Sequence, residues 1–145
     1  MSARALSNRL NQLVNGELQR LLEDSLTEIE DFMLDLNREQ LSDGKDTKGK
    51  GFGNYSEATL IAKEDAGRPA RTSYIVLHDK GDFYRSLVVN IVNNNLIFDA
   101  TDWKLSMLEQ DYGIDILGVS EEDKPKVVSK MYDILSIKLK TFFNV

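Results

Sequence analysis

Residues 77–87 read LHDKGDFYRSL, and the spacing of apolar side chains changes within this stretch. Phe83, Tyr84 and Leu87 recur at the spacing of one helical face, whereas from Leu87 onward the apolar residues alternate at the two-residue period of a strand. The two patterns meet with no linker between them. We therefore predict a rigid corner, residues 79–87, at which the chain enters a β-sheet.

Each polar residue of the corner has an expected structural task. Gly81 has the backbone freedom that a sharp turn needs, and Asp79 or Asp82 is expected to accept a hydrogen bond as a helix cap. Ser86 is expected to form a local hydrogen bond. The apolar members are expected to hold the corner against the helices: Phe83, Tyr84 and Leu87.

The composition limits the classes of function. The chain has 145 residues, which suits a single domain (residues 1–145), and its 24 acidic and 18 basic side chains give a formal net charge of -6. A general nucleic-acid-binding protein needs a basic surface, so this charge argues against one. The chain has no cysteine and no apolar run long enough to cross a membrane. We therefore expect a soluble, unsecreted protein without disulfides or thiolate metal sites.

An antiparallel hairpin is expected at about residues 87–100. Two β-prone segments, 87–92 and 96–100, flank Asn93-Asn94-Asn95, and asparagine tolerates the positive φ angles of tight turns. Residues 74–77 are also short, apolar and β-prone. Together these segments predict a small, mainly antiparallel sheet.

Two helices are expected on the C-terminal side of the hairpin. The first runs from Trp103 to Tyr112 and stops at Gly113, with Trp103 and Met107 expected to fill the core. The second helix is expected to be capped by Ser120. Its apolar stripe contains Val127, Val128, Met131, Tyr132, Leu135, Leu139 and Phe142.

The N-terminal region, residues 1–40, is expected to be helical. Its apolar residues recur at steps of three and four, with a break at Asn15-Gly16 and a longer helix to about Arg38. The apolar faces exceed what a small sheet and one C-terminal helix can obviously cover. Part of this surface could pack between subunits, or the helices could form an ordinary layer within one molecule.

Residues 42–54 read SDGKDTKGKGFGN, and their four glycines and three lysines predict a flexible loop. Ser56 is then expected to cap a short helix that ends before residues 67–69. Residues 55–145 are expected to form a core of helices and strands that includes the C-terminal helix. The chain is thus assigned to the α+β class.

Patterns that would indicate chemistry are weak. Residues 44–51 approach a phosphate-binding loop, but they lack the preceding strand and the following helix that such a loop needs. His78 is the only histidine, and no nucleophile elbow accompanies it. Aspartates near the hairpin could hold a hard cation, although aspartates at turns commonly cap backbone N–H groups: Asp79, Asp82, Asp99 and Asp102. We expect no catalytic residue, no resident metal and no cofactor.

Two segments resemble the tail-completion and head-tail connector (neck ring) proteins of tailed bacteriophages, in a form similar to that of gut Bacteroidetes phages. The pattern of that family runs roughly G-x-Y-S-x-x-T-x-x-x-K, a glycine-containing loop, and L-x-D-T-G-D-F-Y-x-S before a β-hairpin. The matching residues are Tyr55, Ser56, Thr59 and Lys63, then Leu77, Asp79, Gly81, Asp82, Phe83, Tyr84 and Ser86, with Lys80 in place of threonine. The likeness spans about residues 53–125. A His-x-x-Gly-Thr-like segment that follows the hairpin in many members is absent.

The resemblance implies a structural virion protein and not an enzyme. Such proteins form closed rings, usually of six or twelve copies, at the head-tail junction, and they are assembled in the host cytoplasm. The implied partners are further copies of the chain, a portal or adaptor protein, tail proteins and the double-stranded DNA that passes through. An acidic lumen would let this DNA slide. The loop of residues 42–54 would be a docking arm that orders on assembly, with Gly44, Lys48, Lys50 and Phe52.

Two other functions stay open at this point. A small enzyme could use the aspartates near the hairpin with a divalent metal. Alternatively, the chain could be a non-viral oligomeric interaction module, such as a regulatory dimer held by its N-terminal helices.

Overall fold

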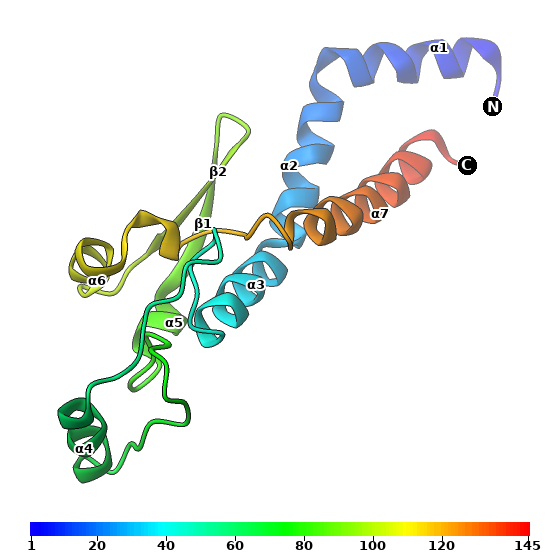
Figure 1. Cartoon of the computed structure of the whole chain (residues 1–145). Helices are drawn as coiled ribbons and strands as arrows, with labels where there is room; N and C mark the ends of the chain where they lie inside the picture. Colours follow the sequence, from blue (N-terminus) through cyan, green and yellow to red (C-terminus); the bar gives the residue numbers. More distant parts are fainter.

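The computed structural model describes residues 1–145 and confirms the α+β prediction. Figure 1 shows an elongated molecule, with α1 and α7 at one end and α4 at the other. In chain order the elements are α1 (Ala3–Gln12), the π-helical turn η1 (Leu13–Glu17), α2 (Leu18–Glu28), α3 (Glu30–Ser42), α4 (Glu57–Asp65), α5 (Asp82–Ser86), β1 (Leu87–Val92), β2 (Asn95–Ala100), α6 (Leu105–Tyr112), the 3-10 turn η2 (Ile114–Ile116) and α7 (Lys124–Phe143).

The N-terminal helices bend at two places. The first is the expected break: Asn15 leaves helical geometry and Gly16 has a φ of 110°, so α1 runs across the axis of α2 (Figure 1). The second lies at Ile29, which the periodicity did not predict, because the apolar spacing continues through it. Just before Ile29, the hydroxyls of Ser25 and Thr27 donate back to carbonyls one turn earlier, a pattern that bends helices.

The predicted hairpin is present, but its turn is one residue shorter than expected, because Asn95 belongs to β2. Leu87 pairs with Ala100 and Val92 pairs with Asn95, so that only Asn93 and Asn94 form the turn. Both have positive φ, 49° and 62°, which is the geometry that keeps a two-residue turn in line with twisted strands. These two hydrogen-bonded strands form the whole sheet.

The expected strand at residues 74–77 is absent. Tyr74 makes one isolated bridge with Asn54, and three residues later Leu77 has a φ of 52°, outside the extended region. The prediction was wrong because β-prone residues form a strand only where a neighbour can pair with the backbone. Here the chain instead turns toward the corner.

One core joins α3, the corner and the hairpin. The helices contribute Ile29, Met33, Leu34 and Leu41, and the remainder comes from Phe83, Leu87, Val89, Ala100 and Ile116. Full burial of each large aliphatic or aromatic side chain contributes roughly 1.5–3 kcal/mol. The corner is therefore fixed at the centre of the molecule.

The helix α6 presents a different face to this core than the sequence predicted. Trp103 and Met107 were expected inside, but their exposures are 78% and 46%. The helix begins at Leu105 instead of Trp103, and Leu105 and Leu108 pack against the core in their place. Trp103 is thus left on the surface in the turn that precedes α6.

The last helix lies mainly along α2. Ser120 accepts a hydrogen bond from the backbone N–H of Asp123 at 3.2 Å, and α7 starts at the next residue with Pro125 in its first turn. Val127 and Met131 pack against the core. The helix nevertheless has no fully buried residue, although it is 20 residues long.

Candidate functional site

The corner is built as a glycine turn, one helical turn and a strand. Gly81 has a φ of 84°, α5 follows it, and β1 begins directly after Ser86. Phe83 and Leu87 are each only 3% exposed, within the core. The Ser86 hydroxyl donates to the Phe83 carbonyl at 2.8 Å, and from α3 the Arg38 Nε donates to the Tyr84 carbonyl at 3.0 Å. Packing and hydrogen bonds thus both tie the corner to α3.

The aspartates of the corner do not cap the helix, contrary to our expectation. The cap position of α5 is occupied by Gly81, and no side chain bonds there. Asp79 instead accepts a hydrogen bond from Arg68 Nε at 3.0 Å, and this bond lowers the pKa of Asp79. Asp82 forms an ion pair with Arg85. Both carboxylates are thus paired with arginines. Arg85 lies three residues after Asp82, whereas nothing in the sequence marked Arg68 as the partner of Asp79.

The phenol of Tyr84 is held inside the corner. Its hydroxyl donates to the Val76 carbonyl, and its ring meets the edge of the His78 ring, with the centroids 4.9 Å apart. Burial raises the pKa of Tyr84 well above the usual value for tyrosine. The folded state therefore keeps Tyr84 neutral under conditions in which the unfolded chain would release its proton.

Alkaline pH should therefore destabilise the protein through Tyr84. Below about pH 10 the Tyr84 phenol is protonated in both the folded and the unfolded state. Above about pH 10 the unfolded state loses this proton first. The free energy of unfolding therefore falls by up to about 1.4 kcal/mol per pH unit until the pKa of the folded state is reached. Urea unfolding across this range should show a smaller loss for Tyr84→Phe than for the parent protein. The exposed Tyr132 provides the control, since Tyr132→Phe should leave the pH profile unchanged. Identical profiles for all three proteins would contradict the assignment.

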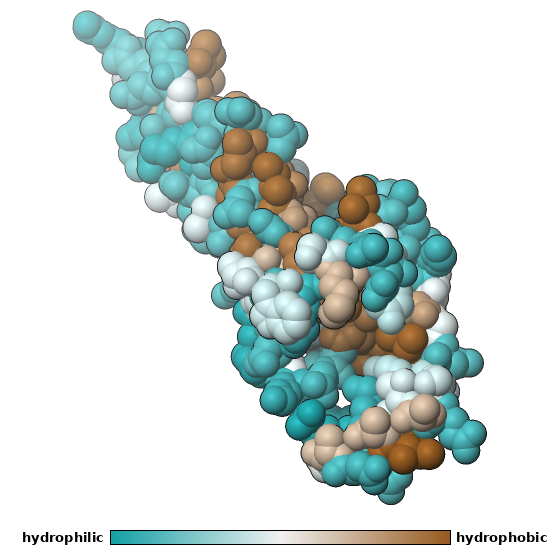
Figure 2. Space-filling model, turned by 90° about the vertical axis from the view of Figure 1, so that its left-hand side faces the viewer, coloured by the Kyte–Doolittle hydropathy of each residue, from teal (hydrophilic) through white to brown (hydrophobic).

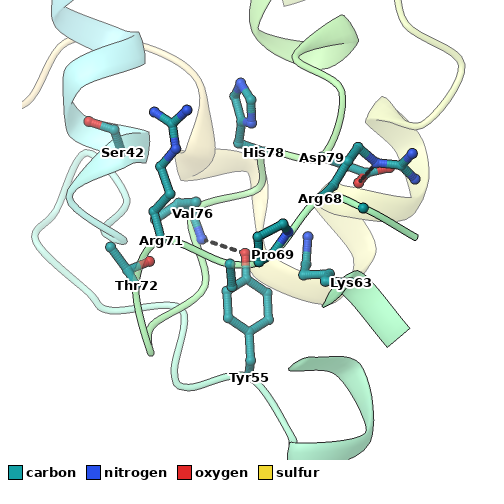
Figure 3. Close-up of a pocket in the computed structure, with 12 residues that line it drawn as sticks. Ser42, Tyr55, Lys63, Arg68, Pro69, Arg71, Thr72, Val76, His78 and Asp79 are labelled. Atoms are coloured by element: carbon teal, nitrogen blue, oxygen red, sulfur yellow. Dashed lines mark hydrogen bonds and ion pairs between the residues drawn. The ribbon is translucent and has the colours of Figure 1, made fainter. Parts of the chain in front are cut away.

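A cavity of about 720 Å³ lies beside the corner (Figure 3). It is lined by residues of α4, of the loop after it and of the segment that leads into the corner. Its charged and aromatic lining residues are Tyr55, Lys63, Arg68, Arg71, His78 and Asp79. Three of the twelve lining residues are hydrophobic, so the cavity is mainly polar.

Two residues of the first family-like segment, Tyr55 and Lys63, line this cavity. Ser56 caps α4, as expected, by accepting a hydrogen bond from the Thr59 backbone N–H at 3.1 Å. Lys63, one turn later, places its Nζ 5.1 Å from the centre of the Tyr55 ring. The Tyr55 hydroxyl in turn accepts a long hydrogen bond, 3.4 Å, from the Val76 N–H (Figure 3). The first family-like segment therefore contacts the chain directly before the second one.

Two side chains hold the base of the segment 42–54, which was expected to be flexible. The Asp46 side chain is buried and accepts hydrogen bonds from the backbone N–H groups of Lys48 and Lys50, at 2.9 and 2.8 Å. The Phe52 ring packs edge-on against Tyr112, with the centroids 5.3 Å apart. Glycine content describes what a free chain can do, whereas the contacts of Asp46 and Phe52 restrict this segment. Lys48 and Lys50 remain exposed at the tip.

Glycine substitutions can test how tightly this loop is held. A Cβ on Gly44 would lie 2.5 Å from Tyr74 Cδ2, and its φ is 72°; Gly49 has a φ of 81° but open space around it. Gly51 has neither constraint. We expect alanine to cost about 2 kcal/mol at Gly44, about 1 kcal/mol at Gly49 and almost nothing at Gly51, measured by urea unfolding. Equal and small effects at all three would mean that the loop is mobile.

Apolar side chains remain uncovered at the end of the molecule formed by α1 and α7. No residue of either helix is buried. Leu6 and Leu10 of α1 are about half exposed, and Val128 and Tyr132 of α7 are 67% and 71% exposed. Figure 2 also shows brown patches breaking the hydrophilic surface on the face that carries α6 and α4. Exposed apolar residues grouped along helices are typical of surfaces that bind other proteins.

The aspartates considered for a metal have separate partners. Asp99 accepts a hydrogen bond from the Ala100 N–H and Asp102 from the Lys104 N–H, whereas Asp79 and Asp82 pair with arginines. No group of three or more His, Cys, Asp or Glu side chains is placed to hold a metal ion.

None of the helices has the length and apolar character needed to cross a membrane.

No protein-family model, curated protein or solved structure matches this chain. The likeness to phage connector proteins therefore rests on the residues quoted for it.

Proposed function

We propose that this chain is a structural subunit of a ring in the head-tail connector of a tailed phage, joining the portal to the tail and completing the DNA conduit. The observation that carries the proposal is the pair of helices, α1 and α7, in which no residue is buried by the chain itself. A 20-residue helix with an apolar stripe is normally covered. Further copies of the chain would supply the cover.

The placement of the two helices favours a ring over a simple pair. They lie at the same end of an elongated molecule (Figure 1). Each helix has exposed apolar side chains of its own, Leu6 and Leu10 on α1 and Val128 and Tyr132 on α7. A contact between two different surfaces is heterologous, and repeating it generates a ring when the rotation closes. The number of copies that we propose, six or twelve, comes from the family resemblance alone.

The loop of residues 42–54 suits contact with a neighbouring protein layer. Its tip carries Lys48 and Lys50 exposed, while Asp46 and Phe52 hold its base. A loop held in this way loses little conformational entropy on binding, so we propose a preformed docking arm for the portal, adaptor or tail protein. This replaces the expected loop that would order only on assembly.

The acidic faces of α2 and α3 are proposed to lie toward the passing DNA. Glu23, Asp31 and Asp35 are exposed along these helices. Like charge would keep the duplex from binding the wall, and the chain would do no chemistry on it. Charge mapping in an assembled ring tests this orientation: a basic lumen would contradict it.

Electron microscopy of the virion tests the function directly. We expect density for this chain as a ring between the portal and the tail, and loss of its gene should leave DNA-filled heads without attached tails. The purified protein should be a monomer by light scattering and should form rings when mixed with the portal. A dimer of fixed mass that ignores the portal would instead favour the regulatory module. Particles that join heads to tails without the chain would overturn the proposal.

A further inference from the structure

The cavity beside the corner is locally cationic, although the chain as a whole has a net charge of -6. Its lining includes Lys63, Arg68 and Arg71 together with the imidazole of His78, against a single carboxylate from Asp79. These side chains surround the cavity, with Arg71 extending toward His78 and Ser42 (Figure 3). The ring proposal makes no use of this arrangement.

Two of the cations have no carboxylate partner. Arg68 is paired with Asp79 at 3.0 Å, so these two charges offset each other. Arg71 forms no ion pair and its side chain makes no hydrogen bond. Lys63 forms no ion pair either; its Nζ lies 5.1 Å from the centre of the Tyr55 ring, and its charge helps Arg68 to lower the pKa of Asp79. Cations that line a concave surface without partners favour an anionic ligand.

The backbone next to Arg71 adds free donors. After Pro69, the N–H groups of residues 70–73 donate to no acceptor within the chain. Ala70, Arg71 and Thr72 all line the cavity. Backbone N–H groups beside an arginine and a lysine are the donors that oxyanions accept, and arginine can offer two parallel N–H groups to one anion.

The size and polarity of the cavity narrow the class of ligand. A volume of about 720 Å³ suits a small molecule or a segment of a larger one. With only three hydrophobic residues among twelve, the lining does not suit an apolar ligand. Two unpaired cations match a doubly charged oxyanion.

We propose that this cavity binds a phosphate group, held by Arg71 and the backbone of residues 70–72, with Lys63 adding positive charge from the other side of the cavity. The group could belong to a small phosphorylated molecule or to the backbone of a nucleic acid, since the contacts are the same. The site is independent of the ring, because none of its residues belongs to α1 or α7.

Titration of the purified full-length monomer with inorganic phosphate tests the site, with sodium chloride used to hold the ionic strength constant. We expect saturable binding by calorimetry, with amide shifts in residues 70–73 by NMR. Arg71→Ala and Lys63→Ala should each weaken binding about tenfold or more, and Arg71→Lys should retain part of it. Arg4→Ala removes the same charge at the far end of the molecule and should change nothing.

Neither Arg71→Ala nor Lys63→Ala should affect folding, because Arg71 is exposed and Lys63 is only partly covered. Circular dichroism checks that both variants are folded. A short DNA duplex added as competitor then separates the two sources. Displacement of phosphate by the duplex assigns the site to the nucleic-acid backbone, and phosphate binding without displacement assigns it to a small phosphorylated molecule. Binding that never saturates, or that Arg71→Ala and Lys63→Ala leave unchanged, would overturn the proposal.

Discussion

Replacement of Asn37 by leucine is expected to lower the free energy of unfolding by about 4 kcal/mol. Asn37 is completely buried in α3, and its amide forms two hydrogen bonds to a distant segment. Its Nδ2 donates to the Ile116 carbonyl at 2.9 Å, and its Oδ1 accepts from the Gly118 N–H at 3.0 Å. Leucine has nearly the same shape but leaves both backbone groups unpaired, the Ile116 carbonyl buried and the Gly118 N–H partly buried, and each such group costs about 1–3 kcal/mol.

Urea unfolding of the monomer measures this effect. Asn90→Leu provides the control, because Asn90 is exposed on β1 and its side chain makes no hydrogen bond; its effect should stay within about 0.5 kcal/mol. We also expect amide exchange at Gly118 to accelerate in Asn37→Leu, since this N–H loses its acceptor. An Asn37→Leu protein as stable as the parent would mean that water or local movement satisfies the two groups.

Elements that depend on neighbouring residues were predictable from the sequence. The hairpin could be placed because consecutive asparagines supply the positive φ of its turn, and the bend at Gly16 because that glycine sits inside an apolar helical pattern. The packing of Phe83 and Leu87 followed from their spacing. In each case the chemistry that determines the structure lies within a few residues.

Features that depend on distant partners were not predictable. Asn37 is separated from its two partners by 79 and 81 residues in the chain, so nothing near it in the sequence marks it as a buried bridge. The pairing of Asp79 with Arg68 and the clustering of Arg71 with Lys63 depend on the path of the loop after α4. Asp46 is an intermediate case: its place in a glycine-rich segment suggests a turn, but nothing in the sequence marks its side chain as buried.

The molecule has a packed core at its centre, whereas most of its exposed apolar side chains lie outside that core. Asn37 and the corner hold α3, the hairpin and the segment after α6 in one core, so assembly need not order them. The exposed apolar residues lie mainly outside that core, on α1, α7 and the region of α6. Variants in the core should therefore change stability, whereas variants at the ends should change assembly. This separation lets the ring proposal be tested without unfolding the protein.

Substitution of Val128 and Tyr132 by glutamate is expected to abolish assembly while the monomer stays folded. Both side chains are more than two-thirds solvent-exposed in the monomer, so charge costs little there. In the proposed ring they would be covered by a neighbour, and an unpaired buried charge costs about 3 kcal/mol or more. Two such charges should weaken association at least about a thousandfold. Light scattering with the portal measures assembly, and urea unfolding verifies the monomer.

A matched control separates burial from net charge. Lys130→Gln/Thr141→Glu changes the net charge by the same two units, at exposed polar positions on the opposite side of the same helix from Val128 and Tyr132. This variant should still form rings, because its new charge would stay in water. If both double variants assembled like the parent, α7 would not be a subunit interface. If both failed equally, general repulsion between acidic subunits, and not a buried apolar contact, would limit assembly; only failure of the first alone supports the proposed contact.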